Sequence, residues 1–515
     1  MGSPPTQTGR PRLREAPRPP VSVSDVGVQE VPEAPEAEEP LPAEAMPSRV
    51  ARNVAALAVA RGVTMLLTLA AVAHVTRALG AEGFGVLGYG LALFGYFSLL
   101  ARPGLDTLAV REIARAPDRV GPLARDVTSL QVALAALAAA LYVAVVFALG
   151  RPPAERAALL LVGLPLLAQP FALDWVYQGV ERMGVLAVRN VAAAVLQLAL
   201  VLALVRGPGD LVWAAAAQGV ALAAVSAALY LAYRRDFGPL RLRVDVAAWG
   251  RLLRPALPIA TSVFMVLIYY NLDKLMLGEI RGDEAVGLYE AAYRWVLVAL
   301  VPGTILVQAF FPTLSAALGD RPAMEERARA YARANVGVGF PIALGGGLLA
   351  APLIAFLAGD AFGAAAPVLR LLMVNVGVVY VNLALSQPLL AWNLQTPYMW
   401  AVGGGAAANV ALNVVLIPTY GAWGAAWATV GAEVVVLVAL SALYWRTVRT
   451  LPVSATALAL CAAALGVGVP IGAATALGWP WLAGAALAAP AYAAAAWALG
   501  VVRPSDLRVL LRRRA

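Results

Sequence analysis

Long apolar runs, separated by short polar segments, follow one another along the chain from about residue 50 to residue 502. Most runs hold about 18 to 25 residues with few charges, which is the length that a helix needs to cross about 30 Å of hydrocarbon. The pattern therefore predicts about fourteen membrane-spanning helices with short connections. We place them near residues 52–78, 84–108, 124–149, 157–180, 185–205, 211–233, 252–278, 285–311, 331–357, 366–392, 398–417, 423–445, 453–476 and 480–502.

Composition indicates the same class of protein. Of the 515 residues, 61% are hydrophobic, and the mean hydropathy is +0.75. About half apolar is ordinary for a soluble domain. We therefore expect an all-α polytopic membrane protein rather than a soluble helical bundle.

The two ends of the chain differ from the rest. Residues 1–48 are rich in Pro, Glu and Arg, so they cannot bury enough apolar surface to offset the entropy of ordering. We interpret them as a disordered cytoplasmic tail that lacks the apolar core of a cleaved secretory signal, with a regulatory binding tail as the alternative. Residues 503–515 are interpreted as a basic cytoplasmic tail.

Charge in the connections predicts how the helices are oriented. Cations gather in alternate connections, such as REIARAPDRVGPLAR (111–125) and DRPAMEERARAYAR (320–333). The connections between them, such as LGEIRGDEAVG (277–287) and AGDAFGAAA (358–366), are nearly free of cations. Because cytoplasmic loops carry the excess of Lys and Arg, both termini are expected in the cytoplasm.

A weak internal repeat divides the chain. AEGFGVLGY (81–89) aligns with DEAVGLYEA (283–291) at an offset of 202 residues, which pairs Gly85 with Gly287. Both copies lie at the turn after a long first helix, so the repeat predicts two pseudo-symmetric six-helix lobes of parallel orientation; a chance match is the alternative. The predicted units are an N-lobe at 49–250, a C-lobe at 251–450 and two further helices at 451–502.

Three arginines are candidate substrate-binding residues. Arg61 and Arg294 each lie about nine residues into a predicted helix, roughly 13 Å deep at about 1.5 Å per residue, and Arg102 lies nearer the cytoplasmic end of its helix. A cation at that depth costs about 2.5 kcal/mol or more unless it meets water, an anion or a partner. Guanidinium groups suit phosphate oxygens, so a cavity with more arginine than carboxylate predicts an anionic ligand.

Asp273 and Lys274, in IYYNLDKLMLGEI (268–280), lie near the predicted outer end of a helix. We expect a self-paired or snorkelling dyad, or an outer-gate salt bridge to Arg281 or Glu284; a direct role in ion coupling is the alternative. The chain has one His and one Cys, which excludes a metal cluster built from those residues. We expect no metal, no cofactor and no nucleic-acid partner.

Five stretches carry a family resemblance. RNVAALAVARGVTMLL…VTRALGAEGFGVLGYG (52–90), LDTLAVREIAR (105–115), DWVYQGVERM (174–183), NLDKLMLGEIRGDEAVGLYEAAYR (271–294) and IPTYGAWGAAWATVGAE (417–433) come in order along the chain. Together they resemble bacterial polysaccharide-export flippases of the MOP (multidrug/oligosaccharidyl-lipid/polysaccharide) superfamily.

The resemblance implies two lobes and a substrate of the undecaprenyl-diphosphate-oligosaccharide class. Arginines line the central cavity of the related lipid II flippase, and Arg61, Arg102 and Arg294 look like their counterparts. In that relative the seventh helix is also linked to ion binding, which makes Asp273 a candidate for ion coupling. The predicted helix at 52–78 contains no second deep cation besides Arg61, unless Arg52 at its start takes that role. This difference from the lipid II flippase favours an oligosaccharide flippase.

The expected function is therefore a flippase, not an enzyme, working by alternating access in the bacterial cytoplasmic membrane. Its expected partners are a lipid-diphosphate-linked glycan and membrane lipid, with polysaccharide assembly machinery as a further candidate. An ion-coupled multidrug exporter of the same superfamily is one alternative. A membrane glycosyltransferase or polymerase is another, disfavoured because the predicted outer loops are short.

Overall fold

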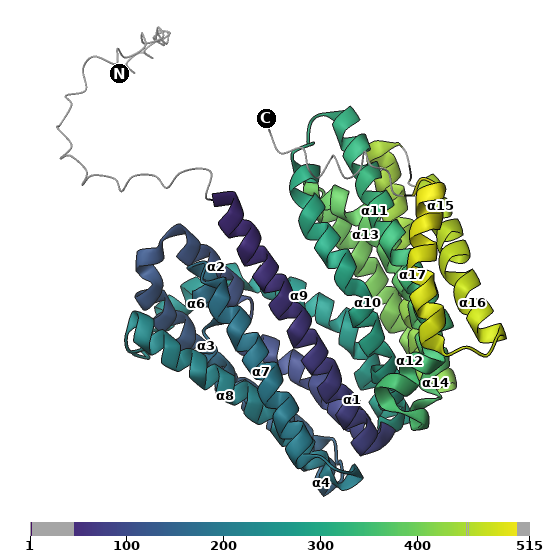
Figure 1. Cartoon of the computed structure of the whole chain (residues 1–515). Helices are drawn as coiled ribbons and strands as arrows, with labels where there is room; N and C mark the ends of the chain where they lie inside the picture. Colours follow the sequence, from purple (N-terminus) through teal and green to yellow (C-terminus); the bar gives the residue numbers. More distant parts are fainter. Residues whose placement is uncertain (1, 3–45, 450, 452, 502–515) are drawn as a thin grey trace. The chain divides into compact units, whose positions relative to one another are not determined.

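The computed structural model describes residues 46–449, 451 and 453–501, together with Gly2, and side chains within helices from residue 60 onward. Within these ranges the backbone is helical with turns and contains no β-strand (Figure 1). The predicted tails lie outside the described residues, except that helix α1 already begins at Met46. By contacts the chain divides into Met1–Val54 and Ala55–Ala515, and the description below concerns the second unit.

The helices of the first half of the chain are α1 (Met46–Ala101), α2 (Leu105–Arg115), α3 (Val120–Ala148), α4 (Pro153–Gly163), α5 (Pro165–Ala168), α6 (Asp174–Gly179), α7 (Met183–Leu204) and α8 (Leu211–Phe237). Those of the second half are α9 (Val246–Arg281), α10 (Asp283–Ser315), α11 (Arg321–Leu348), α12 (Ala350–Ala358), α13 (Ala365–Ala391), α14 (Gln395–Val448), α15 (Val453–Ala463), α16 (Val469–Ala476) and α17 (Trp481–Ala498).

Within the described residues, eleven helical segments are long and apolar enough to cross a membrane, and the bent pair α11 and α12 makes a twelfth. Two of these segments are divided by a glycine in a left-handed conformation, namely Gly80 in α1 (φ 70°) and Gly421 in α14 (φ 57°). Counting their halves separately gives the fourteen helices that the apolar runs predict. The chain is an all-α polytopic membrane protein, as expected.

Three predicted helices are interrupted. The one at 331–357 bends by 74° between α11 and α12, and in the other two proline is part of the cause. The predicted helix at 84–108 ends at Ala101, because Pro103 and the left-handed Gly104 (φ 68°) separate it from α2. The predicted helix at 157–180 is broken between α4 and α6, where Pro165 begins α5 and Pro170 lies in the short turn Gln169–Phe171. Proline lacks the N–H that a continuous helix needs and clashes with the preceding turn.

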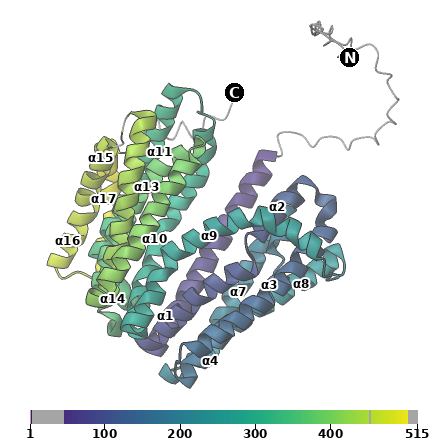
Figure 2. The same ribbon diagram turned by 180° about the vertical axis from the view of Figure 1, so that it is seen from behind.

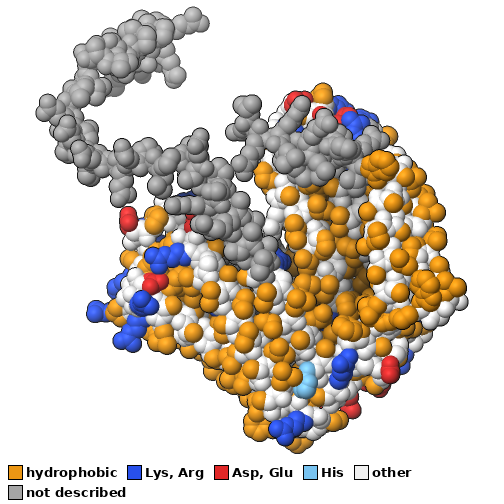
Figure 3. Space-filling model, in the orientation of Figure 1, with side chains coloured by type: hydrophobic (Ala, Val, Ile, Leu, Met, Phe, Trp, Pro, Cys, Tyr) orange, Lys and Arg blue, Asp and Glu red, His pale blue; other side chains and the backbone are white. Residues whose placement is uncertain are grey.

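The helices form two groups that lie on either side of α1 and α9 (Figures 1 and 2). Helices α2 to α8 make one group, and α10 to α17 make the other, in which α15 packs against α11 and α17 against α16. Hydrophobic side chains cover most of the face seen in Figure 3, while charged side chains gather mainly towards its ends. Such an apolar band suits contact with lipid.

Helix α9 contacts both groups. Its first part packs Trp249 and Leu252 into an apolar cluster with residues of α2, α3, α6 and α8. Its last part places Leu277 in the largest core cluster, and it contacts α14 and α10. Between these parts Val263 and Phe264 are exposed. One helix therefore links the first group to the second through a stretch that neither group covers.

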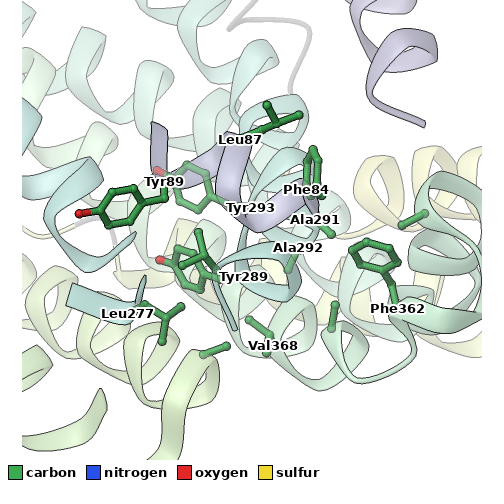
Figure 4. Close-up of a cluster of buried hydrophobic side chains, with 14 of the residues drawn as sticks. Phe84, Leu87, Tyr89, Leu277, Tyr289, Ala291, Ala292, Tyr293, Phe362 and Val368 are labelled. Carbon is green, nitrogen blue, oxygen red and sulfur yellow. The ribbon is translucent and has the colours of Figure 1, made fainter. Parts of the chain in front are cut away.

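The largest core cluster lies where the second part of α1 meets α10. Phe84, Leu87 and Tyr89 of α1 lie close to Tyr289 and Tyr293 of α10 (Figure 4). These aromatic and aliphatic side chains are almost fully buried. Residues from both halves of the chain thus share one continuous core.

The same crossing brings the two copies of the sequence repeat into contact. A Cβ added to Gly85 would collide with the carbonyl oxygen of Asp283, and one added to Gly287 would collide with that of Ala81. At the offset of 202 residues, Ala81 corresponds to Asp283 and Gly85 to Gly287. The contact is therefore reciprocal, as in a two-fold symmetric interface, and supports the repeat as an interpretation of the sequence.

Candidate functional site

Charged side chains of α9 and α10 meet where these two helices pack together. Glu290 of α10, only 3% exposed, lies between two cations. Its Oε1 is 2.6 Å from Nζ of Lys274 in α9, and its Oε2 is 3.7 Å from Nε of Arg294, one turn further along α10. The ammonium group also lies 4.9 Å from the ring centre of Tyr293.

Asp273 completes this buried ionic cluster, which consists of Asp273, Lys274, Glu290 and Arg294. The hydroxyl of Tyr289 donates to Oδ2 of Asp273 at 2.5 Å, and the backbone N–H of Lys274 donates to Oδ1 at 2.9 Å. Two carboxylates and two cations then balance formally. Such compensation is what a low-dielectric interior requires, because an unpaired ion there is costly.

The expectation that Asp273 and Lys274 snorkel to an interface, or bridge to Arg281 or Glu284, is wrong. Asp273 is 2% and Lys274 is 7% exposed, and the lysine pairs with Glu290. Arg281 donates instead to the carbonyl oxygen of Thr419 at 2.8 Å. The dyad is oriented inward because a partner of opposite charge lies on the neighbouring helix.

Arg294 is the least firmly held member of the cluster. Its side chain is 25% exposed, and its Nε is buried without a hydrogen-bond partner in the described residues. The separation of 3.7 Å from Glu290 is longer than a charge-assisted hydrogen bond of about 2.7–2.9 Å. The guanidinium therefore retains donors for a further anion.

Arg61 lies apart from this cluster, on the first part of α1. Its side chain is exposed, and no carboxylate of the described residues lies within ion-pair distance. One turn along the helix, the hydroxyl oxygen of Thr64 is buried without a hydrogen-bond partner there. Arg61 is thus a cation within a candidate membrane span, with its donors uncommitted.

Arg102 belongs to a separate set of polar groups in the first half of the chain. It lies in the break between α1 and α2, not inside a helix, and its Nη2 is 2.7 Å from Oδ2 of Asp106. Gln131 of α3 donates to the other oxygen of Asp106 at 2.8 Å. Of the three predicted arginines, Arg102 is the one whose charge is most fully matched by a carboxylate.

Asp174, at the start of α6, lies close to the same region. Its Oδ1 is 3.3 Å from Nε of Arg189 in α7. Burial raises the pKa of the Asp174 carboxyl, and the guanidinium groups of Arg189 and Arg102 oppose that rise. The break after α5 places this carboxyl where α6 and α7 begin, between helices and not within a continuous span.

A second ionic group, the Arg151 cluster, joins the two halves of the chain. Arg151, between α3 and α4, lies 2.6 Å from Asp283 at the start of α10, 3.1 Å from Glu279 near the end of α9 and 3.6 Å from Glu155. Its guanidinium also covers the ring of Tyr89 at 5.0 Å. Burial alone would lower the pKa of Arg151, but the carboxylates of Asp283 and Glu279 raise it.

Sequence reasoning missed both Glu290 and Arg151. Glu290 is a carboxylate one helical turn before Arg294, and that spacing alone was a signal that the arginine has a partner. Arg151 is a lone cation in a connection facing acid-rich LGEIRGDEAVG, so its charge was also a signal. The pairing itself joins residues 132 positions apart and depends on the fold.

An apolar hollow of about 430 Å³ lies between the end of α1 and the exposed part of α9. Its lining includes Tyr96, Leu100, Pro103 and Phe264, with Thr261 as a polar member. Among the described residues, no group of three or more His, Cys, Asp and Glu is arranged to hold a metal ion.

Comparison with known proteins connects this architecture to transport. A protein from Escherichia coli (strain K12), named "Putative O-antigen transporter", is 25% identical over 275 residues. That alignment covers 52% of this chain and 65% of the relative, so the chain matches somewhat less than two thirds of the relative's length. The printed name of this relative describes a transporter.

Solved structures of the MOP superfamily share the fold. The lipid II flippase MurJ in an inward closed conformation superposes with a TM-score of 0.67 at 12% identity, covering 88% of this chain and 99% of that one. An inward-facing multidrug resistance MATE transporter gives a TM-score of 0.58 at 17% identity, covering 75% and 94%. At such identities the likeness concerns the fold alone.

The family model described as "Polysaccharide biosynthesis protein" matches residues 50–318. This segment is more than half of the 515 residues, and it contains α9 and the ionic cluster on α9 and α10. The resemblance noted in the sequence is thereby confirmed: the chain belongs to the polysaccharide biosynthesis protein family.

Proposed function

We propose that the protein is a flippase that moves a polyprenyl-diphosphate-linked oligosaccharide from the inner to the outer leaflet of a bacterial cytoplasmic membrane. Both termini would lie in the cytoplasm, as the loop charges predict. Family membership and the fold support a transporter of this superfamily. The substrate class is inferred from the charge of the candidate site.

Arg61 carries the proposal, because it is an exposed guanidinium within a candidate span with no carboxylate partner in the described residues. A diphosphate is the ligand that satisfies such a group best, since guanidinium binds phosphate oxygens through two parallel hydrogen bonds. Arg294 would supply a second contact, because Glu290 holds it only at 3.7 Å. Arg102 would act near the cytoplasmic entrance, where Asp106 would orient it.

The apolar hollow between α1 and α9 would take part of the polyprenyl chain. Its lining is almost entirely hydrophobic, and it borders the exposed stretch of α9. A lipid tail could then stay in apolar surroundings while the phosphate meets arginine. An inside-negative potential would favour outward movement of the anion by about 2.3 kcal/mol per net charge per 100 mV.

The decisive experiment is performed in a host strain that lacks the gene. Without the protein, lipid-diphosphate-linked glycan should accumulate on the inner leaflet, and the wild-type gene should restore export. Arg61→Ala should reduce export about 10- to 100-fold at normal membrane abundance, because a hydrogen bond to a charged group contributes about 1.5–3 kcal/mol. Unfolding should be unaffected, since Arg61 has no ion pair to lose among the described residues.

Arg235→Ala is the matched control, because Arg235 is an exposed arginine in the last turn of α8. It should export normally. Normal export by the double variant Arg61→Ala and Arg294→Ala would contradict the assignment of these arginines. A gene deletion that leaves the leaflet distribution of glycan unchanged would contradict the flippase itself.

A multidrug exporter is the second candidate, and one observation favours it. Glu433 of α14 is a buried carboxylate with no cation partner in the described residues, which could attract a cationic drug. Efflux of a cationic dye from cells that express the chain would support this candidate. The glycan assay separates the two functions, because a drug exporter would not change the leaflet distribution of lipid-linked glycan.

A further inference from the structure

Glu433, in the second part of α14, differs from the buried carboxylates of α9 and α10 beside it. It is only 6% exposed, yet no Lys or Arg of the described residues lies within ion-pair distance. Asp273 and Glu290, in contrast, belong to the cluster that contains Lys274 and Arg294. A buried carboxyl without a fixed countercharge is the kind of group that binds a proton.

Both oxygens of Glu433 accept hydrogen bonds from neutral donors. The hydroxyl of Tyr269 in α9 donates to Oε1 at 2.6 Å, and Nδ2 of Asn382 in α13 donates to Oε2 at 2.6 Å. Nδ2 of Asn382 also reaches the backbone carbonyl of Glu433 at 3.1 Å. The ionised carboxylate is therefore bound from two neighbouring helices.

The neutral acid could be bound by the same residues. The side-chain oxygen of Asn382 is buried without a hydrogen-bond partner in the described residues. Turning this amide would present that oxygen to a protonated Glu433, and the Tyr269 hydroxyl can accept as well as donate. The surroundings therefore offer hydrogen bonds to either protonation state, without a fixed charge that would favour one of them permanently.

A hollow of about 140 Å³ lies against this carboxyl, with Asn382 and Ser386 in its lining. The titratable groups around Glu433 are tyrosines: Tyr269 and Tyr270 of α9, Tyr398 in the first part of α14, and Tyr293 of α10. The residues of α13 that line the hollow do not titrate. Water that enters the hollow could deliver or remove a proton.

The position of Glu433 links its protonation state to the packing of α9 against α14. Tyr269 lies on α9, the helix whose first part packs with α2, α3, α6 and α8. A change in the charge of Glu433 changes the strength of its bond to Tyr269, and therefore how firmly α9 is held to α14. That is a local event able to bias a larger rearrangement.

We propose that Glu433 is the proton carrier of this transporter: it takes up one proton from the outside and releases it to the cytoplasm as lipid-linked glycan moves outward. The inference rests on the proposed function. One carboxylate gains and loses one proton per cycle, so no other reactant is needed.

The test uses the full chain in vesicles that contain lipid-diphosphate-linked glycan. A pH difference of one unit should change the steady-state leaflet ratio by up to about tenfold for the wild type. Glu433→Gln keeps an acceptor for the Tyr269 hydroxyl, and its NH2 group can donate to Asn382 once that amide is turned. It cannot ionise, so its transport should not respond to the pH difference. Glu284→Gln, at an exposed carboxylate, is the matched control and should respond like the wild type.

A second measurement does not depend on the substrate. The infrared difference spectrum between acid and alkaline buffer should contain a band from a protonated carboxyl group that is absent in Glu433→Gln. An unchanged band in this variant would overturn the inference, as would a normal response to pH or a wild-type response to a sodium gradient alone. If the band behaves as expected but wild-type vesicles do not move glycan, the proposed function fails while the proton site stands.

Discussion

At the scale of single residues, Glu290 is the carboxylate that neutralises the two cations beside it. Lys274 lies 2.6 Å from one of its oxygens, and Arg294 lies 3.7 Å from the other. Because the Glu290 carboxylate is only 3% exposed, water cannot take its place beside the cations when a substitution removes its charge. Lys274, itself 7% exposed, would then be a buried cation near Asp273 alone.

We therefore expect Glu290→Gln to destabilise the protein by about 3–5 kcal/mol, which is typical of breaking a buried ion pair from one side. Thermal unfolding in detergent measures this effect. Glu326→Gln, at an exposed carboxylate of α11, should leave the midpoint unchanged. Adding Lys274→Gln to the first variant should recover part of the loss, and an additive effect of the two changes would contradict the pairing.

At the scale of helices, the crossing of α1 and α10 depends on two glycines. The backbone of each helix occupies the space where the glycine of the other would carry a Cβ. A backbone carbonyl cannot rotate away as a side chain can, so a methyl group here must push the helices apart. The reciprocal geometry means that Gly85 and Gly287 should be equally sensitive.

Gly85→Ala and Gly287→Ala should each lower stability by about 1–3 kcal/mol or more through overpacking. Gly403→Ala and Gly404→Ala are the controls, because their Cβ positions in α14 are open. They should raise stability by up to about 1 kcal/mol, since alanine favours a helix more than glycine does. Unfolding midpoints compare the four variants, and equal effects at all four positions would contradict a close crossing.

At the scale of the whole second unit, the Arg151 cluster joins the connection after α3 to the adjoining ends of α9 and α10. The loop charges predict that these ends face the outside. Any rearrangement that separates the two helix groups there must break contacts of Arg151 with Asp283 and Glu279. The cluster is therefore placed to hold that side closed.

Arg151→Gln should favour opening on that side by about 1.5–3 kcal/mol, or roughly tenfold or more in population. The measurement is labelling of Thr64→Cys by an impermeant maleimide added outside, in a Cys461→Ser background. Faster labelling is the expected result. Arg206→Gln, at an exposed arginine of the next predicted outer connection, is the control and should not change the labelling rate. An unchanged labelling rate for Arg151→Gln would contradict a role of the cluster in closure.

The apolar pattern predicted most of the fold because the cost of placing polar groups in lipid is a local property of each segment. It could not predict the breaks at Pro103 and Pro165 in full, since a helix in a bundle can accommodate proline when neighbours satisfy the freed carbonyls. Proline within α9, at Pro255 and Pro258, shows the opposite outcome, with the helix continuing through both residues.

The candidate site was less predictable than the fold. Depth along a helix identified Arg61 and Arg294 as unusual cations, but depth does not show the direction of a side chain. The spacing along α10 already places Glu290 beside Arg294, but whether Glu290 also meets Lys274 depends on how α9 and α10 pack together. The role of these arginines in substrate binding stays a prediction.

By itself, the sequence determined that this chain is a helical membrane protein of the polysaccharide biosynthesis family, and it predicted a repeat that includes two glycines. These features follow from local hydropathy and from short motifs read along one dimension. Only the tertiary structure decided which charges neutralise each other, whether Arg61 meets a carboxylate of the described residues, and which carboxyl has neutral neighbours. Those outcomes depend on distances between residues far apart in the chain, because the energy of a buried charge is set by the groups around it in space.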